Sequence, residues 1–340
     1  MRILVYNIIN GERGDFVTER LLVYESASFD PYYNLAVEKA LFDSVDDFTG
    51  ILYLWQNKDT VVIGKNQNAW EECRVSNMEA DGVRLARRLS GGGAVYHDLG
   101  NLNFTFISSS ENYSTDKNIE VIKKACSYAG IEAEKSGRND LLVEGKKFSG
   151  NAFLNSHGHS YHHGTILINS DLERLSKYLS PKKEKFISKG VKSVKSRVAN
   201  LIEFAPYITV DLMKKYLIRA FEEVYGKNAE RMDIISDNIK VNESPFSDWD
   251  FVYGSSLPFE MSAGARFDWG GIDININVEK GVITSVKAYT DAMDPELAEK
   301  IESALSGVRF DCTKIESALD AKKIAVKGDI LTLIKEQLMI

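Results

Sequence analysis

Short apolar segments that alternate with helical ones restrict the fold of this chain more than any other feature. The helical stretches include one that starts at Asp30-Pro31, where Asp supplies an N-cap oxygen and Pro fits the first helical position. Another covers residues 118–131, and Ser170-x-x-Glu173 reads as a capping box that starts a further helix. Five segments read as strands: 51–55 and 60–64, which are apolar enough to be fully buried, and 103–107, 140–143 and 161–169. The pattern indicates an α/β or α+β protein and no repeat architecture.

The composition changes near residue 240. Residues 238–250 are rich in polar and turn residues, which is typical of a linker. Beyond them, the apolar residues from Ile272 to Val278 alternate strictly with polar ones, which predicts a strand with one wet face. A length of 340 residues allows two domains. We therefore expect a first domain over residues 1–245 and a small α+β domain over 246–340.

The overall charge limits the class of partner. The chain has 42 Lys and Arg against 49 Asp and Glu, a net charge of −7, which argues against a uniformly basic nucleic-acid binder. It has no apolar run near the roughly 20 residues that span a bilayer, and its first residues do not resemble a secretory signal. Three cysteines without a C-x-x-C pair indicate a reducing compartment. We expect a cytoplasmic protein that binds neither nucleic acid nor membrane.

Three consecutive glycines stand in the stretch RRLSGGGAVYHDLGN, residues 87–101. Glycine costs backbone entropy, so such a run indicates close approach of the backbone to a ligand. The amides of Gly93, Ala94 and Val95 would donate to anionic oxygens, and Arg88 would bind a phosphate or carboxylate. The motif is neither a Walker A loop nor G-x-G-x-x-G. The alternative is an ordinary hairpin turn with surface arginines.

A second polar cluster lies in residues 137–153. Lys146 and Lys147 follow the Glu144-Gly145 turn. Because successive strand residues point to opposite faces, only one lysine can face a pocket, where its charge would follow phosphate and carboxylate oxygens. Asn139-Asp140 offers a carboxylate for a magnesium ion held by phosphates. The alternative is that both lysines are solvated.

Two further features are less specific. Four of the five histidines fall within seven residues, from His157 to His163, but no cysteine or acidic residue nearby completes a metal site, so a polar strand edge with one pocket histidine is favoured. From Lys177 to Arg197 the sequence contains seven lysines and one arginine but a single glutamate. This basic run is a solvated face or a docking surface for an acidic protein.

Taken in order, these segments resemble bacterial lipoate–protein ligases. The matching stretches are FDPYYNLAVEKALF, LWQNKDTVVIGKNQNAWEEC, RLARRLSGGGAVYHDLGN, SGRNDLLVEGKKFSGNAF, HHGTILINSDLERLSKYL and GVKSVKSRVANL, and RFDWGGIDININVEKGVITSVKAYTD resembles the accessory domain of that family. The resemblance implies an α+β fold: a catalytic domain of mixed β-sheets flanked by helices, related to biotin ligases, and a small C-terminal α+β domain. It also implies two half-reactions. Lipoate and ATP give lipoyl-AMP and pyrophosphate, and a lysine of an acceptor lipoyl domain then takes the lipoyl group.

The resemblance also implies the site residues. Lys147 would be the catalytic residue and contact both the lipoyl carbonyl and the phosphate. The ATP and adenylate positions would be Arg88, Gly93, Ala94, Val95, Tyr96 and Lys147. To these we add Asn139 and Asp140 from their chemistry, with Mg²⁺ at Asp140. The lipoate positions would be Lys147, Ser90, His97, His163, Thr165 and Val37. The acceptors would be lipoyl domains of 2-oxo-acid dehydrogenase acyltransferase subunits and the carrier protein of glycine cleavage.

Two other functions fit the same fold. An octanoyl- or lipoyl-transferase would use a cysteine nucleophile with the lysine and no ATP. Residues 139–175 contain no cysteine, and Cys73 stands in a context typical of a helix turn. A non-catalytic lipoate-binding protein would be favoured by loss of Lys147 or Arg88, and both are present.

Overall fold

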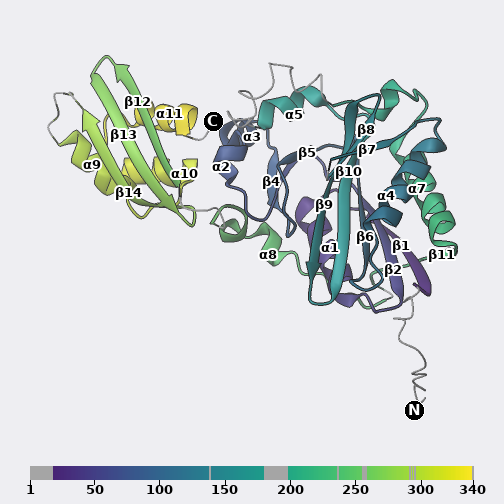
Figure 1. Ribbon diagram of the computed structural model, residues 1–340. Helices are drawn as coiled ribbons and strands as arrows, with labels where there is room; N and C mark the ends of the chain where they lie inside the picture. Colours follow the sequence, from purple (N-terminus) through teal and green to yellow (C-terminus); the bar gives the residue numbers. More distant parts are fainter. Residues whose placement is uncertain are drawn as a thin grey trace, which may run out of the picture.

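The computed structural model describes residues 18–137, 139–179, 198–235, 237–254, 259–290, 292, 294 and 296–338 (Figure 1). The first residues of the chain and most of the basic run between Lys177 and Arg197 lie outside this part, so the expectations placed on them are not addressed by the structure. Within the described residues, no helix combines the length and the apolar character needed to cross a membrane.

An eight-stranded mixed sheet forms the centre of the larger lobe. Its strand order is β11-β1-β2-β6-β10-β9-β8-β7. The pairs β11–β1 and β1–β2 are parallel and the others are antiparallel. The strands are β1 (Arg20–Glu25), β2 (Thr49–Trp55), β6 (Asn101–Ser109), β7 (Glu134–Ser136), β8 (Asp140–Val143), β9 (Lys146–Ser156), β10 (His159–Leu167) and β11 (Ala229–Arg231). Every predicted strand in this region is present, with ends that differ by a few residues.

Helices cover both faces of this sheet (Figure 1). Helices α4 (Thr115–Ser127) and α7 (Val210–Tyr225) pack on one face, together with the turn η2 (Leu201–Glu203). Helix α1 (Pro31–Ser44) packs on the other, and the side chain of its N-cap Asp30 accepts bonds from two backbone amides, as its sequence predicts. The sheet is thus covered on both sides, which explains why β2 is buried along its whole length.

A second, three-stranded sheet lies against the α1 side, with the order β4-β3-β5. Its strands are β3 (Thr60–Ile63), β4 (Arg84–Arg87) and β5 (Val95–His97), and the short helices α2 (Ala69–Glu72), α3 (Val75–Ala80) and α5 (Leu172–Tyr178) accompany them. The prediction of a capping box at Ser170 was wrong in its cap residue. Asp171 is the N-cap of α5, because its carboxylate accepts from the amides of Glu173 and Arg174.

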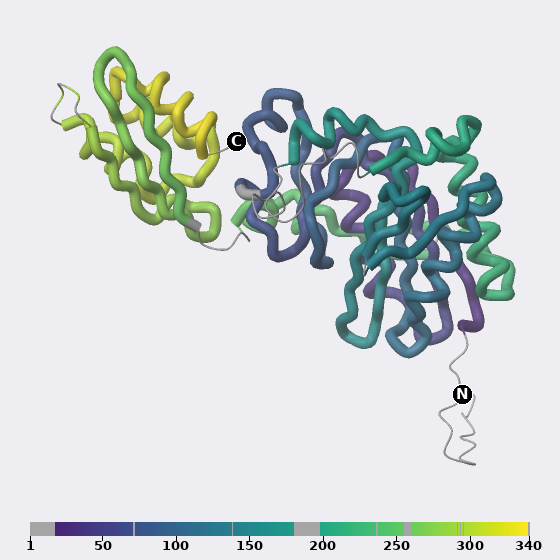
Figure 2. Tube along the Cα trace, turned by 45° about the horizontal axis from the view of Figure 1, so that its top comes forward, coloured from purple at the N-terminus to yellow at the C-terminus, as the bar shows by residue number. Residues whose placement is uncertain are grey.

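The smaller lobe has its own sheet and helices (Figure 2). The sheet is antiparallel, and the apolar residues of β13 are buried, as their alternation predicts. Its elements are β12 (Phe259–Phe267), β13 (Gly270–Glu279), β14 (Val282–Thr290), α9 (Leu297–Leu305), α10 (Cys312–Ala321) and α11 (Lys327–Leu338).

Residues 244–254, which we call the tether, lead from the larger lobe towards this smaller one. They form helix α8 (Ser244–Ser247) and a π-helical turn (Asp250–Gly254). Phe246 is buried in the core around α1, and the buried Arg87 guanidinium donates to the carbonyls of Phe251 and Val252. The segment predicted as a linker is therefore packed on the larger lobe along part of its length.

Candidate active site

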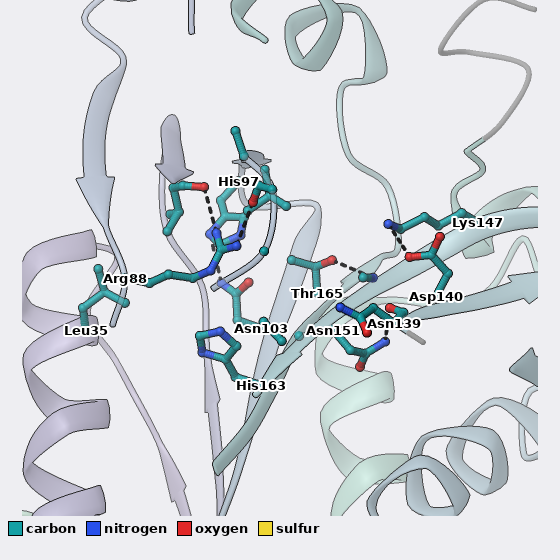
Figure 3. Close-up of a pocket in the computed structure, with 18 of the residues that line it drawn as sticks. Leu35, Arg88, His97, Asn103, Asn139, Asp140, Lys147, Asn151, His163 and Thr165 are labelled. Atoms are coloured by element: carbon teal, nitrogen blue, oxygen red, sulfur yellow. Dashed lines mark hydrogen bonds and ion pairs between the residues drawn. The ribbon is translucent and has the colours of Figure 1, made fainter. Parts of the chain in front are cut away.

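A cavity of about 390 Å³ opens between the two sheets of the larger lobe. Helix α1, the small sheet and strands β8–β10 all contribute to its wall (Figure 3). The lining residues are Leu35, Trp55, Val62, Arg88, Gly92, Gly93, Ala94, Val95, His97, Asn103, Asn139, Asp140, Lys147, Gly150, Asn151, Ala152, His163, Gly164 and Thr165. The glycine-rich stretch and the lysine hairpin, which the sequence singles out separately, thus meet at one site.

The glycine loop, residues 88–94, crosses over the end of β3, because β4 and β5 pair with opposite edges of that strand. Gly92 has a φ of +93°, a conformation that favours glycine. The loop also passes so close to Gly64 that a Cβ there would collide with the Gly92 carbonyl oxygen. Glycine is therefore needed at two positions to seat the loop.

Arg88 holds this loop from inside. Its Nε donates to Ser90 Oγ at 3.1 Å, and its Nη2 donates to the carbonyls of Gly91 and Gly93 at 2.7 Å each. Burial lowers the pKa of Arg88 to about 10, which still leaves it charged at neutral pH. The guanidinium lines the cavity, and its hydrogen bonds join the loop to the Val62 carbonyl of β3, to which Nη1 donates at 3.1 Å, so Arg88 acts first as a support for the loop.

The lysine hairpin places one charge at the cavity. Glu144 and Gly145 both have positive φ, which gives the tight turn between β8 and β9. Lys147 lines the cavity and pairs with Asp140, with Nζ and Oδ1 2.6 Å apart. Lys146 points to the other face, where its Nζ lies 3.4 Å from Glu203. The prediction that only one lysine faces a pocket is confirmed.

A buried polar chain connects the cavity with α1. His163 Nε2 lies 2.7 Å from Ser90 Oγ, and His163 Nδ1 lies 2.8 Å from Glu38 Oε1. The same Glu38 oxygen accepts from Thr105 Oγ1 at 2.7 Å. Sequence reasoning missed Glu38, although a carboxylate on the apolar face of a helix is a signal that could have found it.

His97 packs its ring edge-on against Trp55. Its Nδ1 faces the side-chain amides of Asn57 at 3.2 Å and Asn103 at 3.5 Å. Burial, with help from the charges of Arg88 and His163, lowers the pKa of His97 to about 3. The ring is therefore neutral at every pH at which the protein would work.

Comparison with known proteins identifies the family of this chain. Residues 30–222 match the family model of the lipoyl protein ligase A/B catalytic domain, and residues 256–339 match that of the bacterial lipoate protein ligase C-terminus. A lipoate-protein ligase A of Psychrobacter cryohalolentis is 40% identical over 312 residues, which cover 88% of this chain and 92% of that protein. This chain belongs to the lipoate–protein ligase family.

Solved structures of lipoate ligases have the same fold. P. falciparum LipL1, in complex with lipoate, is 31% identical with a TM-score of 0.61, and the match covers 92% of this chain and 99% of that one. A bipartite lipoate protein ligase of Thermoplasma acidophilum, from a structural analysis of the ligase and its E2 lipoyl domain, is 29% identical with a TM-score of 0.59. The match covers 70% of this chain and 97% of that one. A lipoate-protein ligase A bound with ATP is 28% identical with a TM-score of 0.57, covering 66% of this chain and 92% of that one.

Within this ligase, most of the residues that the resemblance implied line the cavity, but three do not. Ser90 is fully buried behind His163. Val37, a residue of α1, is fully buried in the core. Tyr96 turns its side chain away, packs against Tyr178 and donates its hydroxyl to Asp59.

The cysteines and possible metal ligands of the ligase can also be placed. Cys73, Cys126 and Cys312 are all buried, and burial raises the pKa of each thiol, that of Cys126 to about 12. No cysteine is among the described residues that line the cavity. In the same part of the chain, no group of three or more His, Cys, Asp and Glu is arranged to hold a metal ion.

Proposed function

We propose that this lipoate ligase works in two steps. The carboxylate of lipoate attacks the α-phosphate of ATP to give lipoyl-AMP and pyrophosphate, and a lysine amine of an acceptor lipoyl domain then displaces AMP from the acyl carbonyl. One observation carries this proposal: the Lys147 cation and the glycine loop line the same cavity. Joining a carboxylate to a triphosphate brings negative charges together, so the site needs a cation and pre-oriented donors at the junction.

We assign the following roles to the cavity residues. Lys147 neutralises the acyl and phosphate oxygens during both steps, and the loop amides from Gly93 to Val95 bind the nucleotide phosphate. Arg88 keeps that loop in place through its bonds to the Gly91 and Gly93 carbonyls. His163 and Thr165 line the lipoyl-adenylate site, with Ser90 behind His163. Leu35 and Trp55 supply the apolar wall for the dithiolane end.

Asp140 suits a magnesium ion that ATP brings. It is the one carboxylate among the described residues that line the cavity, its side chain is 42% exposed, and Asn139 beside it also lines the wall. Mg²⁺ keeps several waters and takes one or two protein oxygens besides phosphates, which matches this sparse donor set. Asp140 would then exchange its Lys147 partner for the ion, and Lys147 would be released towards the phosphates.

The acceptors that we propose are lipoyl domains of 2-oxo-acid dehydrogenase acyltransferase subunits and the carrier protein of glycine cleavage. The Thermoplasma ligase studied with its E2 lipoyl domain supports this class of partner. We also propose that residues 1–245 form the catalytic domain and residues 246–340 an accessory domain. The separate family matches over 30–222 and 256–339 support this division.

Release of pyrophosphate tests the proposal. We expect pyrophosphate release that requires ATP and lipoate together and does not require an acceptor. When a lipoyl domain is then added, we expect it to lose the charge of one lysine. An octanoylated carrier protein offered without ATP is the control for transferase chemistry. Modification of the acceptor from that donor, with no pyrophosphate released from ATP, would replace the ligase mechanism with the transferase one.

A further inference from the structure

One ring nitrogen in the cavity wall is left without a partner. His97 is 3% exposed and lines the cavity, and its Nε2 is fully buried with no hydrogen-bond partner among the described residues. A buried polar atom in that state costs free energy unless something else satisfies it. The other ring nitrogen, Nδ1, determines whether Nε2 carries a hydrogen.

A chain of amides fixes what Nδ1 must do. Asn34 is fully buried, and its Oδ1 accepts from the hydroxyls of Ser26 and Tyr53. Its Nδ2 therefore donates, and one acceptor is Asn57 Oδ1 at 3.0 Å. With its oxygen used in this way, Asn57 turns its Nδ2 to His97 Nδ1. A donor amide facing Nδ1 requires that nitrogen to be unprotonated.

A second amide chain reaches the same atom from another strand. On β6, Asn101 Nδ2 donates to Asn103 Oδ1 at 2.9 Å. Asn103 therefore also presents its Nδ2 to His97 Nδ1, at 3.5 Å. This second pair does not fix its own orientation, because Asn101 Oδ1 has no partner among the described residues. The anchored Asn34–Asn57 chain makes Nδ1 an acceptor, so the ring hydrogen resides on Nε2.

We propose that Asn57 and Asn103 are positioning residues that lock His97 in its neutral Nε2–H form, so that this N–H donates to an oxygen of the acyl-adenylate junction. The assignment of the ligand rests on the proposed function, whereas the tautomer does not. Because Nε2 already carries its hydrogen and the ring does not take up a second proton, His97 is a fixed donor and is not the base that deprotonates the acceptor lysine.

The charges around the ring favour the same state. Arg88 and His163 are the titratable groups that act on His97, and both disfavour a positive ring. Trp55 packs edge-on against the imidazole, with ring centroids 6.1 Å apart, and restricts its rotation. A neutral donor held in this way is oriented before the ligand arrives, which is the property of donors that stabilise developing negative charge.

Nitrogen NMR of the full-length protein tests the tautomer directly. In protein labelled with ¹⁵N-histidine, we expect the His97 signal to have the Nε2–H pattern, unchanged from about pH 8 down to about pH 5. His97→Leu assigns the signal by its loss. An Nδ1–H pattern, or a change to imidazolium over this range, would overturn the proposal. In Asn57→Leu we expect an additional Nδ1–H population, and its absence would show that Asn57 does not set the tautomer.

Binding of a stable mimic tests the donor role. Lipoyl sulfamoyl-adenylate is the probe, and we expect it to shift the His97 Nε2–H proton and slow its exchange with water. If the probe perturbs His163 but leaves His97 unchanged, the donor role is wrong while the ligase function stands. If the probe does not bind at all, the proposed function fails, and the tautomer result is unaffected.

Paired substitutions separate a donor from a base. Gln places an amide near the imidazole Nε2 position, and its oxygen can accept from Asn57 and Asn103. We expect His97→Leu to lower kcat/KM of pyrophosphate release about 100-fold and His97→Gln to recover about tenfold of that loss. If His97 were a base, both substitutions would remove it equally. Equal activity of the His97→Leu and His97→Gln proteins would therefore refute the donor role.

Discussion

Lys147 Nζ and Asp140 Oδ1 lie 2.6 Å apart across the β8–β9 hairpin, and both side chains line the cavity. Each is more than a third exposed, so the pair is accessible to a charged ligand that competes for either partner. The ion pair therefore orients the lysine at the cavity without removing it from solvent.

Lys147→Ala should lose lipoyl-AMP formation by a factor of about 1,000, because it removes the one lysine charge that the described cavity residues supply. Pyrophosphate release measures this. Lys146→Ala is the matched control, since the neighbouring residue carries the same charge but faces Glu203. Comparable losses in the two variants would contradict the assignment.

Arg88→Ala should damage both stability and activity. The substitution removes a buried charge that donates to Ser90, Gly91 and Gly93, and we expect a loss of about 3 kcal/mol in the free energy of unfolding. Urea unfolding measures the loss, and pyrophosphate release at a temperature where the variant is folded measures activity. Normal stability would show that the loop does not depend on this support.

Stability should fall at acid pH because of two buried histidines. Burial lowers the pKa of His97 and of His162 to about 3, below the value of about 6.5 in an unfolded chain. The unfolded state then binds more protons below pH 6.5, so stability is complete near pH 7.5 and declines as the pH drops. Each histidine lowers the free energy of unfolding by about 2 kcal/mol between pH 7.5 and pH 5.

Urea unfolding at these two pH values checks this dependence. His162→Gln keeps a donor for Asn151 Oδ1 but does not titrate, so it should reduce the pH dependence by about 2 kcal/mol. His157→Gln is the control, because His157 is exposed. A pH dependence identical in all three proteins would rule out His162 as a cause.

Cys73, Cys126 and Cys312 should be dispensable for ligation. Each is buried with a raised thiol pKa, and none lines the cavity. The triple Cys→Ala protein should keep ATP-dependent lipoylation within about threefold, at a modest cost in stability from lost packing. If the folded triple variant no longer modifies the acceptor, a cysteine takes part in the reaction, and the result would support the transferase mechanism.

Shortened chains should differ according to whether they keep the tether. A chain that ends at Gly254 retains the Phe251 and Val252 carbonyls that bind Arg87, whereas a chain that ends at Ser247 leaves this buried guanidinium without them. We expect the shorter chain to be less stable by about 3 kcal/mol. Equal melting temperatures would show that the tether adds nothing to the larger lobe.

Local signals account for what the sequence predicted correctly. The Asp30 cap, the strand alternation around Ile274 and the opposite faces of Lys146 and Lys147 all depend on a few neighbouring residues. The cap of α5 was assigned to the wrong residue because Ser170 and Asp171 are both good cap formers, and only the backbone geometry decides between them.

The rest depends on contacts between distant segments. Forty residues separate Asn57 from His97, and 125 separate Glu38 from His163, so no local pattern shows that these side chains meet. The polar stretch around Phe246 similarly looks like a linker until the tertiary fold supplies Arg87 as a partner for the following carbonyls.

Arg87 and Arg88 are consecutive residues with guanidinium groups directed to different structures. The first holds the carbonyls of the segment that leads to the smaller lobe, and the second holds the carbonyls of the loop that forms one wall of the cavity. Any movement that draws Val252 away from β4 must break bonds at Arg87, a single peptide unit from the anchor of the glycines. The end of β4 therefore connects the segment that leads to the smaller lobe with the loop that shapes the cavity.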